Sequence, residues 1–514
     1  MSSRREFLEA LAALGLASGL PRGACAAPRF ATDPFGLGVA SGYPTSGSAV
    51  LWTRLITDLE RYDGGLDPVV VPVRWEVASD DAMRTIVASG VETAAPEWAH
   101  SVHAEVRGLE PERWYWYRFT AGDAVSPVGR LRVAPRRGAS VERLRFAFAS
   151  CQQYEQGYYA AYRHIVADNP ELIVFLGDYI YESSWGRDHV RRHNPGEPYT
   201  LDEYRMRYAC YKSDPDLQAA HAACAWLATW DDHEVDNDYA GDRPEDGMPR
   251  ERFLARRAAA YRAYYEHMPL PARMRPYGPH MRLYTQFGWG SLARFFLLDD
   301  RQYRAYQACP RKSGGGTVVG EHACAARTAP GRSMLGARQE AWLARAFADS
   351  RAGWNVVAQQ TLMAQFARGS GDARRYWTDG WDGYPAARRK LLESMAAERL
   401  ANPVVIGGDV HHHAVSDLKV DFDDAASPVV ASEFCGTSIT SQARPQKELD
   451  ATVAENPHVK LADGRHRGYV RIELNARQLR ADMRAMETVQ ARGAPCTTLA
   501  SFAVEDGRPG PRRA

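Results

Sequence analysis

Acidic and histidine side chains follow several short apolar stretches of this chain. Such β-branched stretches are typical of central parallel strands, and α/β proteins place their sites where those strands end. Carboxylates can bridge two cations, and a neutral imidazole suits a transition metal. The pattern predicts a polynuclear metal centre, whose candidate ligands are Asp178 after residues 172–176, Asp232 after residues 225–230, and Asp409 and His411 after residues 403–406.

Two further side chains near the same predicted sheet edge narrow the choice of metal. Cys151 follows a strand-like stretch at residues 144–149, and Tyr181 lies three residues beyond Asp178. A thiolate and a phenolate are strong donors that favour a ferric ion over magnesium. We therefore expect both among the ligands. The alternatives are a small buried hydrophobic residue or a disulfide partner for Cys151, and a core aromatic residue for Tyr181.

Two charged residues suit a phosphate group better than a metal. His233 can donate a hydrogen bond to phosphate or act as a general acid. Arg301 can clamp phosphate oxygens with two parallel hydrogen bonds, and an ion pair with Asp299 or Asp300 is an equally good interpretation. The chain has no G-x-S-x-G motif, no H-E-x-x-H motif and no glycine-rich nucleotide loop. These residues therefore predict hydrolysis by metal-activated water.

The order of the predicted elements indicates two folded parts and a tail. Strand-like stretches dominate residues 28–138 and predict a separate β-sandwich of the immunoglobulin or fibronectin kind. Strands alternate with helices over residues 140–500, which predicts an α/β domain. Residues 501–514 end in a run of Arg, Pro and Gly, and we expect them to be disordered.

Residues 1–26 have the parts of a twin-arginine export signal. The motif S-R-R-x-F-L at residues 3–8 precedes a moderately apolar stretch, and an A-x-A sequence ends at Ala26. We expect cleavage after Ala26 and export of the folded protein by the twin-arginine machinery, into the periplasm or the extracellular medium. No other stretch is long and apolar enough to span a bilayer.

The length, net charge and cysteine count limit the class of protein and the number of disulfides that can form. A chain of 514 residues can bury a large core, and its net charge of +1 gives no sign of a nucleic-acid partner. Export permits disulfides, and seven of the eight cysteines remain once Cys25 leaves with the signal. Cys151 is the expected unpaired residue. The expected pairs are Cys210–Cys224, Cys309–Cys324 and Cys435–Cys496.

Two segments of the α/β part have the composition of insertions. Residues 311–329 are rich in Gly and Ala and lie between Cys309 and Cys324, so we expect a stapled loop. Residues 377–384 are aromatic and acidic, and we expect them at the mouth of a pocket.

Five motifs resemble those of the PhoD-like alkaline phosphatase/phosphodiesterase family. The Trp-Asp-Asp-His-Glu-Val stretch is specific, and with the β module and the signal the similarity covers nearly the whole mature chain. The resemblance implies an α/β fold in which an N-terminal β-sandwich precedes a four-layer αββα metallophosphatase-like domain. The motifs are residues 150–152, 177–182, 230–235, 298–304 and 407–411.

The resemblance also implies a set of metal ions and ligands. Family members are described as holding one ferric ion with calcium; other divalent metals are the alternative. By position, Cys151, Asp178 and Tyr181 correspond to the iron ligands, with Asp178 bridging to calcium. The remaining assignments are Asp409 and Asn237 for calcium, and Asp232 and His411 at metallophosphatase motif positions.

One departure from the family pattern concerns the residues after the Trp-Asp-Asp-His-Glu-Val motif. The family often has an acidic residue followed by two asparagines, whereas this chain has Asp236, Asn237 and Asp238. If the second asparagine is the ligand, Asp238 offers a harder anionic ligand and the metal preference shifts.

The function that the resemblance implies is secreted hydrolysis of phosphate esters at alkaline pH, and we expect a monomer. One alternative is a phosphodiesterase or phospholipase D-type activity on phospholipid or cell-wall diesters. Another is a non-catalytic secreted binding protein. A di-iron or iron–zinc site of the purple acid phosphatase kind is disfavoured by Cys151 and by Asp409 in place of a histidine.

Overall fold

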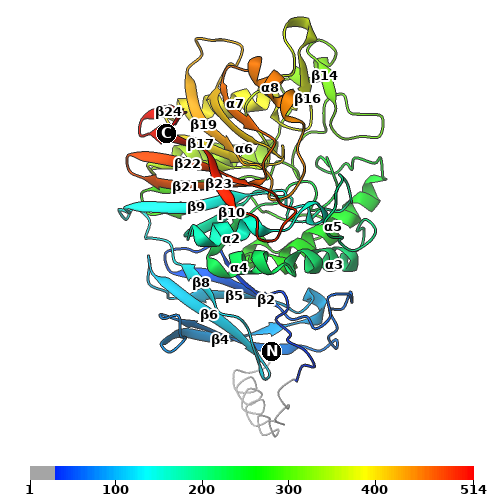
Figure 1. Ribbon diagram of the computed structural model, residues 1–514, viewed down its shortest axis with the longest axis vertical. Coiled ribbons are helices and arrows are strands. Elements are labelled where there is room, and N and C mark those ends of the chain that lie inside the picture. Colours follow the sequence, from blue (N-terminus) through cyan, green and yellow to red (C-terminus); the bar gives the residue numbers. More distant parts are fainter. Residues whose placement is uncertain (1–28) are drawn as a thin grey trace, which may run out of the picture.

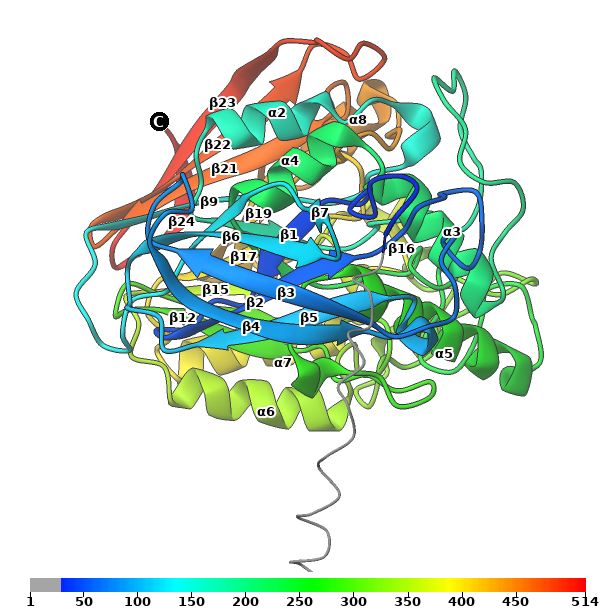
Figure 2. The same ribbon diagram turned by 90° about the horizontal axis from the view of Figure 1, so that it is seen from below.

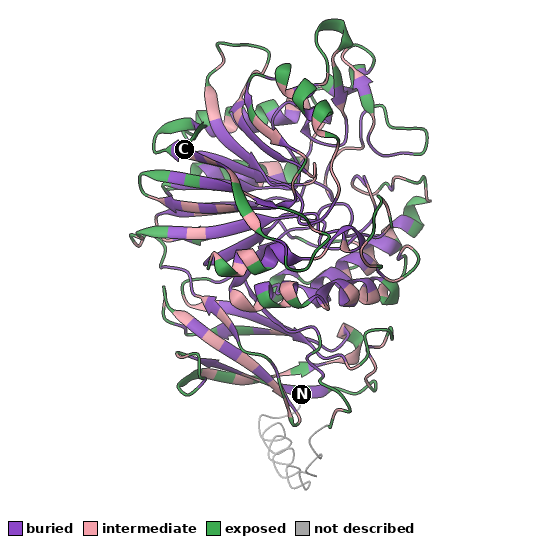
Figure 3. Cartoon of the chain, viewed as in Figure 1, coloured by how far each residue is buried: buried purple, intermediate pink, exposed green. Residues whose placement is uncertain are grey.

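Two large β-sheets and the helices around them form the body of the protein (Figure 1). The computed structural model describes residues 29–514, so the expected export signal and its cleavage after Ala26 lie outside the described residues. Buried residues are concentrated along the strands of both sheets (Figure 3).

The larger sheet has ten strands. In spatial order they are β24 (Arg508–Arg513), β23 (Cys496–Glu505), β22 (Gln478–Met486), β21 (Gly468–Asn475), β9 (Arg143–Ala149), β10 (Leu172–Phe175), β11 (Ala225–Ala228), β1 (Val39–Gly42), β2 (Ser48–Arg54) and β5 (Ser101–Arg107). The central strands β9, β10 and β11 are parallel, so their carboxyl ends lie at one edge. All four residues of β10 are buried, as expected for a strand covered on both faces.

The second sheet has seven strands. In spatial order they are β12 (Thr285–Trp289), β13 (Ala293–Leu297), β15 (Trp354–Ala358), β17 (Pro403–Gly407), β19 (Val429–Cys435), β18 (His413–Lys419) and β20 (Val459–Asp463). Strands β13, β15, β17 and β19 are parallel neighbours. The strands predicted at residues 294–298, 354–358 and 403–406 correspond to β13, β15 and β17 within one residue at each end.

The α-helices have ordinary start signals. Thr200 and Glu203 form a reciprocal capping box at α3, and Asp214 caps α4 with Pro215 in its first turn. The helices of residues 29–514 are α2 (Ala160–Ala167), α3 (Leu201–Lys212), α4 (Pro215–Ala223), α5 (Arg250–His267), α6 (Gly336–Ala348), α7 (Pro385–Ala397) and α8 (Gln446–Ala454).

The two sheets face each other, as neighbouring residues of β13 show. Phe295 contacts Phe146 of β9 with 5.2 Å between ring centroids, whereas Phe296 contacts Phe347 of α6 at 5.0 Å. Successive residues of a strand point to opposite faces of its sheet. The seven-stranded sheet therefore lies between the ten-stranded sheet and α6.

Helices also cover the outer face of the ten-stranded sheet. Trp226 of β11 contacts Tyr162 of α2 and stacks on His221 of α4. Figure 2 shows α2 and α4 on one side of the sheets and α6 and α7 on the other. This is the predicted α/β class, with the helix–sheet–sheet–helix order that the family resemblance implies.

The N-terminal β module, which we expect over residues 28–138, contributes strands to two sheets. One of its sheets contains β4 (Ile86–Ala94), β3 (Val71–Ala78), β6 (Trp114–Ala121), β7 (Ala124–Val125) and β8 (Gly129–Arg132). The other strands, β1, β2 and β5, extend the ten-stranded sheet. The link is the parallel pairing of Ser41 and Gly42 with Ala225 and Trp226.

The expected disorder of residues 501–514 is wrong. Residues up to Glu505 belong to β23, and β24 returns beside it after an Asp506-Gly507 turn. Gly507 has φ +71°, a left-handed conformation that glycine adopts without strain. Phe502 is buried, and the Gly510 N–H donates to Ser432 Oγ of β19 at 2.9 Å. The tail therefore contacts both sheets.

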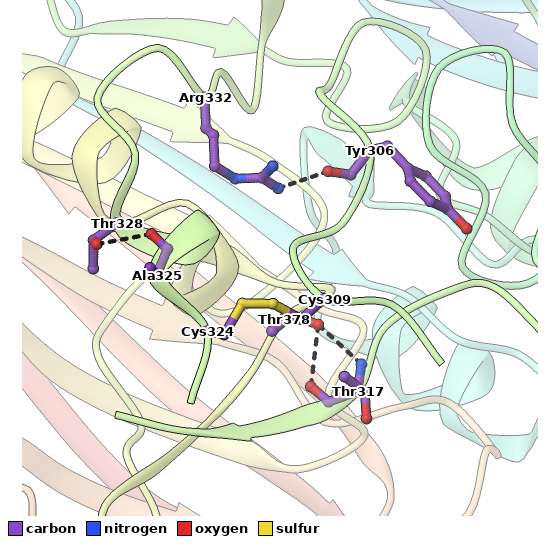
Figure 4. Close-up of a disulfide and its surroundings, with 8 residues drawn as sticks. All are labelled: Tyr306, Cys309, Thr317, Cys324, Ala325, Thr328, Arg332 and Thr378. Atoms are coloured by element: carbon purple, nitrogen blue, oxygen red, sulfur yellow. Dashed lines mark hydrogen bonds between the residues drawn. A yellow bond between two sulfur atoms is a disulfide. The ribbon is translucent and has the colours of Figure 1, made fainter. Parts of the chain in front are cut away.

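One of the three expected disulfides is present. Cys309 and Cys324 are bonded and staple the predicted loop, close to the contact between Thr317 and Thr378 (Figure 4). The loop contains β14 (Val318–Gly320), which pairs with β16 (Arg375–Trp377) of the second insertion. The other two expected pairs are wrong, because Cys210, Cys224, Cys435 and Cys496 are free, as is Cys151.

Among residues 29–514, no helix combines the length and the apolar character needed to cross a membrane.

Candidate active site

Loops from both sheets meet at the edge where the parallel strands end. Strands β9, β10 and β11 lead to Cys151, Asp178 and Asp232, and β17 leads to Asp409 and His411. Candidate ligand atoms lie within 4.8 Å of one another in each of three overlapping groups. These are Cys151–Asp178–His411, Asp178–Asp232–His233 and Asp231–Asp232–Asp409.

Tyr181 reaches the same point from the loop after β10. Its hydroxyl lies 2.8 Å from Asp178 Oδ2, 3.2 Å from His411 Nε2 and 2.8 Å from Ser441 Oγ. Burial and the neighbouring Asp178 charge raise the pKa of Tyr181 well above its usual value. Burial and, to a smaller extent, the Asp178 carboxylate also raise the pKa of the Cys151 thiol well above its usual value. A compensating cation is therefore needed to stabilise the phenolate and the thiolate.

Several of these residues have strained backbone conformations. Cys151, Asp178, Asp409 and His411 have φ values of 59°, 58°, 65° and 57°, in the left-handed region. For a residue with a side chain this costs about 1–2 kcal/mol, and such strain concentrates at functional sites. The strand ends are therefore shaped to bring these side chains together at a cost in stability.

Glu234 holds two of the strand-end turns in place. Its buried carboxylate accepts hydrogen bonds from the backbone N–H groups of Asp178 at 3.1 Å, Tyr179 at 2.7 Å and Asp231 at 2.8 Å. These bonds join the loops after β10 and β11. Sequence reasoning missed this role, although Glu234 belongs to the most specific motif.

His233 is oriented by a carboxylate. Its Nδ1 lies 2.7 Å from Glu182 Oε2, and the structure records no hydrogen bond for Nε2 within residues 29–514. The ring packs on Tyr181, with centroids 4.1 Å apart, and lines the cleft described below. Burial lowers its pKa, but the charges of Glu182, Asp178 and Asp232 outweigh burial and raise the pKa well above its usual value.

Arg301 is an ion-pair centre, with partners other than those expected. Its side chain is 1% exposed; it bonds Asp231, lies 2.7 Å from Asp379 Oδ2, and is 3.5 and 3.6 Å from Asp232 and Asp409. Neither Asp299 nor Asp300 pairs with it. Arg301 is not among the residues that line the cleft, and its guanidinium is surrounded by these four carboxylates.

The two residues at the family departure both line the cleft but have different partners. Asn237 lines the cleft, and its amide donates to Glu245 Oε2 at 2.6 Å. Asp238 groups with Asp232 and Asp379, and its Oδ2 accepts from Gly316 N at 2.9 Å and Arg311 Nη2 at 3.0 Å. Asp238 therefore ties the site to the stapled loop.

A cleft of about 950 Å³ opens beside the strand ends. This is near the upper end of the size range of small-molecule sites. Asp178, Asp232, His233, Asp409 and His411 line one part of it. The second insertion lines another part, as expected from its composition, through Trp377, Asp379, Gly380, Trp381 and Asp382.

The donor set fits metal ions. Oδ1 of Asp178 is fully buried without any hydrogen-bond partner within residues 29–514, and so is Oδ2 of Asp231. A buried unpaired carboxylate oxygen is costly unless a cation compensates for it. A thiol, a phenol and an imidazole lie next to Asp178, which is a set of donors that suits iron.

Sequence reasoning missed several residues of this site. Asp231 and Asp379 hold Arg301, Glu182 orients His233, and Ser441 contacts Tyr181. Asp231 and Glu182 belong to quoted motifs, so their polar character was a usable signal. Ser441 lies in a loop far along the chain with no local pattern.

An α/β fold with carboxylate, imidazole, thiol and phenol groups gathered at the strand ends beside a cleft defines a metal-dependent hydrolase. Comparisons with known proteins specify the family. Residues 146–483 match the PhoD-like phosphatase family, and residues 21–135 match its N-terminal domain. The chain therefore belongs to the PhoD-like phosphatases.

Two similar proteins cover nearly the whole chain. Alkaline phosphatase D of Bacillus subtilis (strain 168) is 47% identical over 498 residues, which are 95% of this chain and 84% of that protein. A solved structure described as the structure of PhoD superposes with a TM-score of 0.89 and 46% identity. It covers 95% of this chain and 93% of that one.

Proposed function

We propose that the cleft hydrolyses phosphate esters at alkaline pH, with water rather than a protein side chain as nucleophile. Family membership makes the chain a phosphatase, and the similar Bacillus subtilis protein is named an alkaline phosphatase. The observation that carries the proposed site is Asp178. It is buried, has one oxygen without a partner, and lies in reach of Cys151, His411 and Asp232.

The proposed iron ligands are Cys151, Asp178 and Tyr181, and Asp409 and Asn237 are proposed for calcium, with Asp178 shared. Close contacts around Asp178 and the missing partner for its Oδ1 support this assignment. When bound, such cations neutralise charge on the phosphate and activate water for attack. Asp232 and His411 lie close enough to Asp178 to complete the ligand sets.

The side chains around this centre have distinct proposed roles. Glu182 fixes the ring of His233, so that Nε2 faces the cleft and can donate a proton to the departing alcohol oxygen. Arg301 holds Asp232 and Asp409 against their mutual repulsion. Trp185 stacks on His411 at an interplanar angle of 10° and limits the rotation of that ring.

Phosphodiesters are a second candidate substrate class, including phospholipid head groups and cell-wall diesters. The volume of the cleft favours this candidate, because about 950 Å³ is ample for an ester with groups on both sides of the phosphate. Comparing 4-nitrophenyl phosphate with bis(4-nitrophenyl) phosphate decides between them. A higher kcat/KM for the bis ester would make diesters the preferred class.

We also propose export through the twin-arginine machinery, to the periplasm or the medium, and action as a monomer. The support is the S-R-R-x-F-L motif, the apolar stretch and the A-x-A site of residues 1–26. Replacing Arg4 and Arg5 with lysine is expected to retain the protein in the cytoplasm, as fractionation would show. Unchanged export would contradict this route.

The direct test of the active site is Asp178→Asn. Asparagine keeps the shape but removes the charge, so we expect turnover of 4-nitrophenyl phosphate at alkaline pH to fall by about a thousandfold or more. Asp246→Asn, which changes a cleft residue outside the proposed ligand set, is the matched control. Unfolding midpoints show whether both variants fold. Near-normal turnover of folded Asp178→Asn would refute the assignment.

A further inference from the structure

Two arginines in the wall of the cleft have fewer partners than Arg301, which contacts four carboxylates. Nε and Nη2 of Arg444 are buried without a hydrogen bond, and the carboxylate recorded beside it, the exposed Glu448, is 3.7 Å away. For the Arg368 side chain the structure records no hydrogen bond or ion pair within residues 29–514, although the residue is only partly exposed. Guanidinium groups removed from water normally have acceptors, so this pair is incomplete.

The two guanidinium groups also repel each other. Burial, and then the charge of Arg368, lower the pKa of Arg444 to about 10. Burial likewise lowers the pKa of Arg368, against the raising effects of Glu448 and Asp382. A bound anion between the two groups would relieve both the burial cost and the repulsion.

The chain path places Arg444 close to the proposed metal centre. Ser441 contacts the hydroxyl of Tyr181, and the carbonyl of Gln442 lies 2.8 Å from Nδ1 of His411. Three residues span at most about 11 Å. The backbone of Arg444 therefore lies within about 11 Å of that of Ser441, and residues 442–445 line the cleft.

The cleft is lined by charges of both signs. Arg368, Arg444 and His412 line it, and Phe366 packs on His412. The acidic residues that line the cleft beyond the strand ends are Glu182, Glu197, Asp236, Asp238, Glu245, Asp246, Asp379 and Asp382. An anionic group attached to the reacting phosphate is repelled by these carboxylates and attracted by the two arginines.

We propose that Arg368 and Arg444 form a subsite for a second phosphate group, so that the preferred substrates carry two phosphates joined by a short linker. The proposal rests on the proposed function, because it takes the metal centre as the place where the first phosphate reacts. Arg187 also lines the cleft but is highly exposed and close to Asp188, and it has no part in the subsite.

A matched pair of substrates tests the subsite. 1,3-Propanediol bisphosphate and 1,3-propanediol monophosphate differ only in the second phosphate, and phosphate release gives kcat/KM for each. Wild type is expected to prefer the bisphosphate. Arg444→Gln and Arg368→Gln should each reduce that preference by about tenfold or more, the effect of losing a charged hydrogen bond. Arg187→Gln should leave the preference within about twofold.

Binding provides a readout that does not depend on turnover. Calorimetry on the Asp178→Asn protein, with and without Arg444→Gln, should show a dissociation constant for the bisphosphate about tenfold or more higher in the double variant. An unchanged substrate preference and an unchanged dissociation constant in folded variants would overturn the subsite. Failure of wild type to hydrolyse either compound or 4-nitrophenyl phosphate would instead overturn the proposed function.

Discussion

Replacing Lys212 with methionine is expected to raise the free energy of unfolding near neutral pH and to have less effect as the pH rises. Lys212 is buried between the rings of Trp52 and Tyr179, with its Nζ 4.2 and 5.5 Å from their centroids. Its Nζ donates to the Tyr179 hydroxyl at 3.3 Å, and no salt bridge to it is recorded within residues 29–514. Burial lowers its pKa from 10.5 to about 7.

The direction follows from proton binding. Between about pH 7 and pH 10.5 the unfolded lysine is protonated and the folded lysine is neutral. Because the unfolded state binds more protons, the free energy of unfolding rises with pH, by about 1.4 kcal/mol per unit. Below pH 7 both states are protonated and the slope vanishes. From pH 7 to pH 9 the free energy of unfolding of the wild type should therefore rise by about 3 kcal/mol. This contribution is absent from Lys212→Met.

Urea unfolding of both proteins at pH 7, 8 and 9 measures this difference. Methionine matches the length of lysine and keeps the ring contacts, and Tyr179 retains its 2.7 Å hydrogen bond to His221. Subtracting the free energy of unfolding of one protein from that of the other at each pH removes the contribution of groups that titrate in both. Parallel pH dependences, or a variant less stable by a constant amount, would refute the reasoning.

Three further predictions concern the loop, the turns and the tail. Replacing Cys309 and Cys324 with serine opens a link between residues 15 apart and should lower the free energy of unfolding by about 3 kcal/mol; an unchanged urea midpoint would contradict this. Glu234→Gln should lower kcat by about tenfold while KM changes little, because an amide NH₂ replaces one acceptor of the backbone N–H groups; normal kcat would show that the turns hold without it. Trypsin should spare the peptide bonds of β24 in the native protein, and early mass loss there would contradict its order.

The positions of the site residues were largely predictable from the sequence. Asp178, Asp232 and Asp409 each follow a short apolar strand, and parallel strands place such residues at one sheet edge. The α/β class followed from the same alternation. Distances and left-handed backbone conformations at these positions depend on the packing of two sheets, which no local pattern describes.

The errors have physical causes that a local pattern cannot reveal. Residues 501–514 were judged from their final Arg, Pro and Gly, whereas the Asp506-Gly507 turn and contacts to β19 order them. Arg301 was expected to clamp phosphate, with an ion pair to Asp299 or Asp300 as the alternative, whereas its guanidinium contacts carboxylates from other loops. Two cysteine pairs were expected from proximity in sequence and the third by elimination, but proximity along the chain does not fix the distance between two side chains, and only Cys309–Cys324 forms.

The central claim is that Cys151, Asp178 and Tyr181 hold a metal ion on which hydrolysis depends. Elemental analysis of natively exported protein, with Cys151→Ser beside it, tests this claim most directly. We predict iron and calcium in the wild type, and loss of most iron, of any visible tyrosinate–iron absorption and of activity in the folded variant. Iron-free wild type with full activity, or unchanged iron in Cys151→Ser, would contradict the account.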